Sequence, residues 1–242
     1  MAKQGFDYFY DPITIEAARS ADDERTRELH GDDVDRARRK GFGTTSPEQE
    51  PGRAERRQAA YLDTLTSAQH SSWGRALYGD RGQRKFTVEV PGVGTMEAPT
   101  SGCIAHARAE LYGDYEKWVR ADTFVNSRFL PVNKVVKQQP RYVQATQRWS
   151  ACMRTKGYHF ADPGEAAQSA ATTSHTVPGS RTAIQVAVGS AECDQKTGRS
   201  KAQRELFEQY TLQWVKDHQS LAADFRKINR EALARARTLL RS

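Results

Sequence analysis

The stretch Met153–Pro163, "MRTKGYHFADP", nearly repeats the sequence of Met1–Pro12, "MAKQGFDYFYDP". Each copy reads Met, three residues, Gly, an aromatic residue, one further residue and a second aromatic residue, and Asp-Pro follows after two intervening residues in the first copy and one in the second. A glycine in the left-handed conformation closes many helices, and the apolar residue after it packs on the preceding turn. Asp-Pro then disfavours a continuing helix. We therefore interpret each copy as a helix ending that aromatic side chains hold in place.

The three cysteines are arranged around these two copies. Cys152 directly precedes the second copy, and Cys103 and Cys193 each follow one copy at or near a helix start. We expect a disulfide between Cys152 and Cys193, which would stabilise the fold by roughly 4 kcal/mol on the chain-entropy model. Cys103 is then unpaired, and we expect the natural chain to continue before Met1 with a helix that ends in Cys-Met. An alternative is that all three cysteines are reduced and buried as small apolar side chains.

The hydrophobic pattern predicts a mainly α-helical protein, a helical bundle of two related halves with a small β-hairpin and a long C-terminal helix. The hairpin is expected near residues 84–99, where apolar and polar residues alternate before the turn sequence "PGVG". A helix is expected after Ser101, with a break near Gly113, because glycine weakens a helix interior. Another helix is expected to begin at Pro140, since proline suits a first helical turn.

We divide the chain into three segments on this basis. Residues 1–57 contain the first copy and a charged, partly flexible region, and residues 58–139 form the first helical half with the hairpin. Residues 140–242 form the second half. This half contains the second copy, a loop at 164–180 that we expect to be flexible because it is small and polar, and the long C-terminal helix.

The C-terminal helix carries two candidate interaction surfaces. Apolar residues recur every seven positions, a pattern typical of packing against another long helix or a protein partner: Phe207, Trp214, Leu221 and Ile228. Basic residues on the same segment are candidate contacts for a polyanion: Lys216, Arg226, Lys227, Arg230, Arg235 and Arg237. The alternative reading of these charges is a solvated helix face.

Composition and motifs give little sign of catalytic or cofactor chemistry. The formal net charge is +7, and no run of about 18 apolar residues predicts a transmembrane helix. Cys103 and His106 have a spacing that suits metal binding, but no second ligand pair lies near them in the sequence. We recognise no nucleophile, zinc or dinucleotide motif. We therefore predict no catalytic residues, no metal and no cofactor, although an enzyme whose site assembles only in three dimensions stays as an alternative.

Several stretches carry a resemblance to a known family: "WSACMRTKGYHFADP" (149–163), "AIQVAVGSAEC" (183–193), "GFDYFYDP" (5–12) and "ARRKGFG" (37–43). They resemble uncharacterised actinobacterial secreted proteins and lipoproteins with a repeated Cys-Met-x-x-x-Gly-aromatic motif. The resemblance covers most of the chain and implies an extracellular or cell-envelope location, but it implies no activity. The sequence departs from the family pattern in lacking a leader and the first cysteine.

Together these observations favour a non-enzymatic cell-envelope or extracellular protein that binds an unknown ligand or has a structural role. The alternative is a cytoplasmic, nucleic-acid-associated helical protein that uses the basic C-terminal helix. A count of reduced thiols separates the two locations, because a disulfide persists in oxidising compartments.

Overall fold

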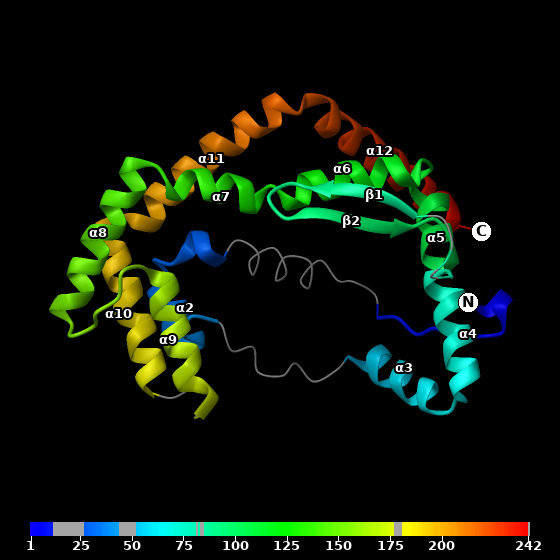
Figure 1. The fold of residues 1–242 in the computed structure, drawn as a ribbon, viewed down its shortest axis with the longest axis horizontal. Helices are drawn as coiled ribbons and strands as arrows, with labels where there is room; N and C mark the ends of the chain where they lie inside the picture. Colours follow the sequence, from blue (N-terminus) through cyan, green and yellow to red (C-terminus); the bar gives the residue numbers. More distant parts are fainter. Residues whose placement is uncertain (12–26, 44–51, 81, 83–84, 177–180, 242) are drawn as a thin grey trace. The chain divides into compact units, whose positions relative to one another are not determined.

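The structure is a computed structural model that describes residues 1–11, 27–43, 52–80, 82, 85–176 and 181–241. It is mainly α-helical with one two-stranded hairpin, as predicted (Figure 1). The chain forms two compact units, each built from separate stretches of sequence. Unit 1 contains Met1–Pro12, Pro51–Val132 and Thr211–Ser242, and unit 2 contains Ile13–Glu50 and Asn133–Tyr210. These units differ from the three consecutive segments that we expected, because residues 27–43 pack with the second half of the chain.

Unit 1 combines the hairpin with several helices. Its elements are η1 (Ala2–Gln4), α3 (Arg53–Asp63), α4 (Ser67–Tyr78), β1 (Lys85–Val90), β2 (Gly94–Pro99), α5 (Gly102–Tyr112), α6 (Tyr115–Ser127) and α12 (Gln219–Leu239). Helices α7 (Phe129–Lys137) and α11 (Arg199–Asp217) each contribute residues to both units. Within unit 1, α12 and β1 both pack against α6.

The hairpin is stable because one of its faces is buried against helices. Strand β1 pairs antiparallel with β2, so that Phe86 lies opposite Ala98. Phe86 and Val88 are buried together with Trp118 of α6 and Ile228 of α12. Two strands alone are marginally stable in water, and this helical cover supplies the burial that they lack.

The predicted helix break occurs at the expected glycine. Helix α5 ends at Gly113, whose φ of 78° favours glycine, and α6 begins directly afterwards. The side chain of Asp114 accepts a hydrogen bond from the backbone N–H of Lys117 and caps α6. The expected start of α8 (Pro140–Thr155) at Pro140 is also confirmed.

The apolar seven-residue repeat does not lie on one continuous helix. Helix α11 ends at Asp217 and α12 begins at Gln219, so Phe207 and Trp214 belong to one helix and the two later residues to the other. Trp214 stacks on Phe124 of α6 with ring centroids 4.9 Å apart, and Ile228 is buried in the core of unit 1. The repeat is therefore divided between two helices, and Trp214 and Ile228 make contacts within unit 1.

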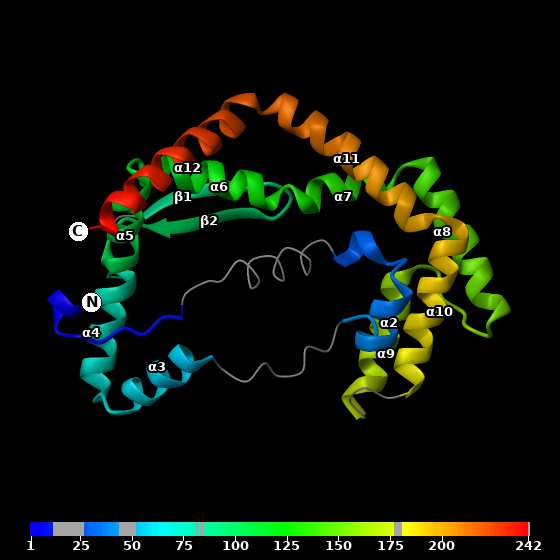
Figure 2. The ribbon, with the colours of Figure 1, turned by 180° about the vertical axis from the view of Figure 1, so that it is seen from behind.

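Unit 2 consists of α10 and the elements that pack around it. These elements are η2 (Arg27–His30), α2 (Val34–Lys40), α8, α9 (Pro163–Thr176) and α10 (Arg181–Thr197). Helix α10 contacts α2, α8 and α9, which lie beside it in both ribbon views (Figure 1 and Figure 2). Trp149, Met153, Ala166, Val186 and Cys193 form its buried cluster.

The end of α8 has the predicted conformation. Gly157 adopts a φ of 85°, and its N–H donates to the carbonyl of Arg154 at 3.0 Å. The N–H of Tyr158 donates to the carbonyl of Met153, also at 3.0 Å. This pair of bonds is the Schellman motif. The rings of Tyr158 and Phe160 pack against the buried cluster of unit 2, so the aromatic side chains hold the helix end in place.

The loop expected at 164–180 is instead α9 over Pro163–Thr176. The carboxylate of Asp162 accepts hydrogen bonds from the N–H groups of Gly164 and Glu165 and so caps this helix. The prediction of a loop relied on the small, polar composition of the stretch and did not take into account that Asp162 can cap a helix. Residues 177–180 lie outside the described residues, as do residues 13–26 and 44–51 of the charged region that we expected to be partly flexible.

Candidate binding site

Unit 2 contains a cavity of about 690 Å³. Its walls come from the η2–α2 segment, one face of α8, the start of α9, the middle of α10 and Arg199 at the start of α11. Cavities of about 300–1,000 Å³ are typical of small-molecule sites. This cavity is therefore the candidate binding site in the described part of unit 2.

Small residues on the surrounding helices leave the space open. Ala37, Ala167, Ala187 and Ala191 line the cavity where larger side chains would fill it. On α8 the lining residues Val143, Gln147, Ser150 and Arg154 recur every three or four positions and so share one helical face. The site thus combines a wall of small apolar residues with a polar helix face.

The acidic side chains of the cavity are engaged by the protein itself. Asp33 accepts a hydrogen bond from the N–H of Arg36 at the start of α2, and Asp162 caps α9. Glu28 forms an ion pair with Lys137. In contrast, the exposed side chain of Arg154 has no hydrogen-bond or ion-pair partner among the residues that the structure describes. Arg154 is therefore a cation of the cavity wall with which an acidic ligand could pair, beside the carboxylates of Asp33 and Asp162, which keep their negative charge.

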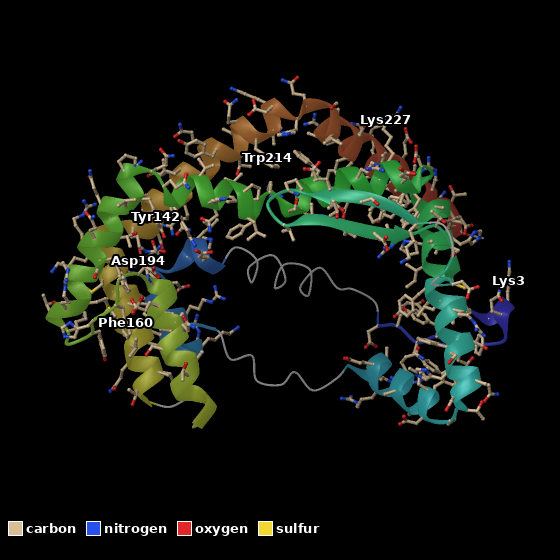
Figure 3. All side chains as sticks on the ribbon, viewed as in Figure 1. Lys3, Tyr142, Phe160, Asp194, Trp214 and Lys227 are labelled. Carbon is tan, nitrogen blue, oxygen red and sulfur yellow. A yellow bond between two sulfur atoms is a disulfide. The ribbon has the colours of Figure 1, made fainter. Side chains whose placement is uncertain are left out.

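A buried ion pair lies beside this cavity. Arg199 and Asp194 are only 2% and 1% exposed, and their side chains approach to 2.8 Å. Arg199 also donates to the hydroxyl of Tyr142 at 2.9 Å, and Asp194 accepts hydrogen bonds from the N–H and the hydroxyl of Ser200. Figure 3 shows Tyr142 and Asp194 on neighbouring helices of unit 2. Each member of the pair thus has several partners, which offsets the cost of burying charge.

The buried pair raises the pKa of Arg199. Burial by itself lowers the pKa of this guanidinium, but the charge of Asp194 and the contact with Tyr142 raise it above its ordinary value. Like other arginines, Arg199 is protonated at ordinary pH, and these contacts favour its charged form further. Asp194 neutralises the charge of Arg199 inside the protein. The Arg199 side chain therefore links neighbouring helices and does not offer a free cation to a ligand in the cavity.

The same network extends to the chain segment before α2. The amide of Gln203 donates to Asn133 at 2.9 Å, and Asn133 donates to Glu28 at 3.1 Å. Gly31 lies so close to the ion pair that a Cβ atom there would be 2.8 Å from the Asp194 carboxylate and 2.9 Å from the Arg199 guanidinium. A side chain at Gly31 would thus displace the buried pair. The network therefore positions the η2–α2 segment, which forms one wall of the cavity.

Asp32, in the segment before α2, forms an ion pair with Arg204, and we expect this pair to make the stability of unit 2 depend on pH. Burial by itself raises the pKa of Asp32, but the hydrogen bond and charge of Arg204 lower it by more, so its pKa lies below the ordinary value. A lowered folded-state pKa means that the pair stabilises the protein above about pH 4 and loses this contribution as the pH falls through the folded pKa.

We therefore expect Arg204→Gln to flatten the loss of stability on acidification. The measurement is the urea midpoint of unfolding at several pH values between about 6 and 2.5 for the parent chain and the variant. The difference between the two proteins should be about 1 kcal/mol or less at the upper end of this range, because the pair is partly exposed, and should shrink at low pH. A constant difference over the whole range would contradict this assignment.

The structure confirms the predicted disulfide and leaves Cys103 without one. Cys152 and Cys193 are bonded, with Cα atoms 5.7 Å apart. Cys103 is a half-buried residue of α5. Among the described residues, no three or more His, Cys, Asp or Glu side chains lie close enough together to hold a metal ion. Cys103 and His106 are therefore not part of such a group.

The predicted polyanion contacts lie outside the cavity, and one of them has a structural role. Arg235 donates to the carbonyl of Leu111 at 3.1 Å and pairs with Glu231. The others are exposed: Lys216, Arg226, Lys227, Arg230 and Arg237. Figure 3 shows Lys227 on α12.

Sequence reasoning missed the cavity and its ion pair altogether. Asp194 and Arg199 lie in a charged stretch that resembles a solvated helix end, and the sequence gives no sign that both are buried. The one local signal is the small-residue spacing of Ala183, Ala187 and Ala191 on α10, which indicates close helix packing but not a cavity. No described helix combines the length and the apolar character needed to cross a membrane.

No protein-family model, no curated protein and no solved structure matches this chain.

Proposed function

We propose that this protein is a non-enzymatic cell-envelope or extracellular protein that binds a small acidic ligand in the cavity of unit 2. The observation that carries the proposal is that Arg154, in the lining of the cavity, has no hydrogen-bond or ion-pair partner among the described residues. The acidic side chains of the cavity bond to the protein itself, whereas Arg154 projects from the polar face of α8. A ligand with an acidic group and a compact apolar body would satisfy Arg154 and the alanine-rich wall together.

Two hydroxyl groups in the lining of the cavity support binding over nucleophilic catalysis. The Ser150 hydroxyl donates to the carbonyl of Phe160 at 2.6 Å, and the Thr146 hydroxyl donates to the carbonyl of Tyr142 at 3.0 Å. A catalytic hydroxyl instead donates to a base that can remove its proton. These groups therefore serve the structure and can accept a hydrogen bond from a ligand.

The disulfide supports the proposed location. Structural disulfides persist in extracellular and envelope compartments and are rare where cellular reductants keep thiols reduced. Cys193 is fully buried and its bond to Cys152 joins α8 to α10, which together form two walls of the cavity. The proposed membership of an actinobacterial secreted family agrees with this location.

Filling the cavity tests the proposal directly. The fluorescent probe 1-anilino-8-naphthalenesulfonate has a sulfonate for Arg154 and an apolar body, and we expect it to bind the folded protein saturably. Ala167→Trp, which places a large ring in the cavity, should abolish this binding, whereas the neighbouring exposed change Gln168→Trp should leave it intact. Titration of probe fluorescence, with circular dichroism as the folding control, measures both.

The role of the charge is tested on the same helix. Arg154→Ala should weaken probe binding by about tenfold, the size expected for a lost charged hydrogen bond, while Arg148→Ala outside the cavity should not. Equal probe binding by the Ala167→Trp and Gln168→Trp variants would show that the probe sits elsewhere and would overturn the assignment of the cavity.

The second candidate function, a nucleic-acid-associated protein of the cytoplasm, is favoured by the outer face of α12. Arg226, Arg230 and Arg237 are spaced four and seven residues apart and share one exposed face. Ile228 and Ala232 are buried on the opposite face. This arrangement suits a polyanion that contacts the helix from outside.

Salt-dependent retention tests this second function. If α12 binds polyanions, Arg226→Gln/Arg230→Gln should elute from immobilised heparin and from duplex DNA at clearly lower NaCl than the parent chain. The control Arg39→Gln/Arg148→Gln removes the same charge from exposed sites of unit 2. Equal shifts for both pairs would mean that only net charge matters and would exclude a site on α12.

A further inference from the structure

The outward face of α12 combines arginine with leucine. Five residues recur there at alternating spacings of four and three positions: Arg226, Arg230, Leu233, Arg237 and Leu240. Leu240 follows the last residue of α12, but its N–H still donates to the carbonyl of Ala236 at 3.0 Å, so it continues the helical turn. Residues at these spacings lie in one line along a helix. All five are exposed, and we call this line the arginine–leucine stripe.

The charges of the stripe are available to a partner. Its three arginines have no hydrogen-bond or ion-pair partner among the described residues. The two acidic residues of α12 point away from the stripe and are already paired, Asp224 with Lys117 and Glu231 with Arg235. Lys227 adds a further exposed cation beside the stripe. The outward face of α12 is therefore positive along its length and fits a negatively charged partner.

The leucines decide which class of anionic partner fits. Leu233 is 58% exposed and Leu240 is 88% exposed. Nucleic acid presents phosphates to a basic helix, and contact with phosphates would leave both leucine side chains in water. A second copy of the stripe would place arginine opposite arginine, which is unfavourable.

An anionic lipid bilayer suits both residue types. It carries phosphate groups at its surface and apolar acyl chains directly beneath them. A leucine side chain can lie among the headgroups at the edge of the apolar layer, while the long stem of a neighbouring arginine lets its guanidinium reach a phosphate. The stripe places each leucine next to such an arginine, because Leu233 lies between Arg230 and Arg237 and Leu240 follows Arg237.

We propose that the arginine–leucine stripe docks this protein on the surface of an anionic phospholipid bilayer, with both leucines inserted among the headgroups. Ile228 and Ala232 remain buried on the opposite face of α12, so the helix can bind without leaving the core of unit 1. The proposal does not depend on a ligand in the cavity of unit 2.

Vesicle binding by the full chain tests the proposal. In about 0.1 M NaCl, the protein should sediment with vesicles of phosphatidylglycerol and phosphatidylcholine in equal amounts, but not with vesicles of phosphatidylcholine alone. Leu233→Gln/Leu240→Gln keeps the net charge and the helix propensity, and should weaken binding to the anionic vesicles by about tenfold because the buried apolar surface is lost. Its elution from immobilised heparin should not change. Arg226→Gln/Arg230→Gln should weaken vesicle binding by more than about tenfold, since each arginine near an anionic surface contributes about fivefold.

A matched pair of leucines provides the control. Leu130 and Leu212 are 53% and 59% exposed on other helices of unit 1, and Leu130→Gln/Leu212→Gln should bind anionic vesicles as the parent chain does. Circular dichroism checks that every variant is folded. Equal losses for the two leucine pairs would mean that exposed apolar surface in general drives binding, and would overturn the proposal. Unchanged vesicle binding by Leu233→Gln/Leu240→Gln would mean a contact through charge alone, as for nucleic acid, and would overturn it too, as would a parent chain that does not bind anionic vesicles.

Discussion

Replacing Arg199 by methionine is expected to lower the free energy of unfolding of unit 2 by about 3–5 kcal/mol. The variant removes every hydrogen bond of a buried guanidinium and leaves the carboxylate of Asp194, only 1% exposed, without its opposite charge. An uncompensated buried charge is among the few mechanisms that produce a loss of this size. Urea denaturation followed by circular dichroism measures the change.

Two further variants isolate the role of burial. Arg141→Met breaks the ion pair with Glu205, in which both side chains are largely exposed, and should cost about 1 kcal/mol or less. The double variant Arg199→Met/Asp194→Leu removes both buried charges and should recover part of the loss. If Arg199→Met and Arg141→Met lowered the free energy of unfolding by equally small amounts, the Asp194–Arg199 pair would not be desolvated in solution. The buried network described beside the cavity would then be wrong.

Removing the disulfide is the second change with a large expected effect. Cys152→Ala/Cys193→Ala should destabilise unit 2 by about 4 kcal/mol, because the bond spans 41 residues and restricts the unfolded chain. Cys193 also lies in the buried cluster with Trp149 and Met153, so its loss removes packing there. The midpoint of guanidinium unfolding under non-reducing conditions is the measurement.

Cys103→Ala is the matched control and should change the free energy of unfolding by less than about 1 kcal/mol, since Cys103 is half-buried and has no disulfide. Thiol titration of the unfolded parent chain, purified without reductant, should find one thiol from Cys103. Three thiols in a stably folded protein would contradict both the disulfide and the oxidising location that we propose.

The local features of the fold were predictable because neighbouring residues decide them. Gly113 and Gly157 end helices through their own positive φ, and Pro140 begins α8 because it suits the first turn. The hairpin follows from alternating side chains around a turn. The Cys152–Cys193 bond was predictable from the repeated phrase, because that phrase places one cysteine at a helix end before a later cysteine.

The sequence was insufficient to predict elements whose conformation depends on packing against distant segments. The stretch after Pro163 has the composition of a loop, yet it forms α9 because Asp162 caps it and Ala166 is buried against α8 and α10. The apolar seven-residue repeat suggested one long helix, but the chain divides at His218 between α11 and α12. Both outcomes depend on which surface each segment finds to pack against.

The sequence by itself determined the helix ends, the hairpin and the disulfide of this protein, because each depends on backbone preferences or on one short pattern. Only the tertiary structure decided that Asp194 and Arg199 are buried and that Arg154 faces a cavity without a partner among the described residues. The physical reason is that desolvation and charge pairing depend on what surrounds a side chain. Those surroundings come from segments that lie far apart in the chain, as the bond between Asn133 and Glu28 illustrates.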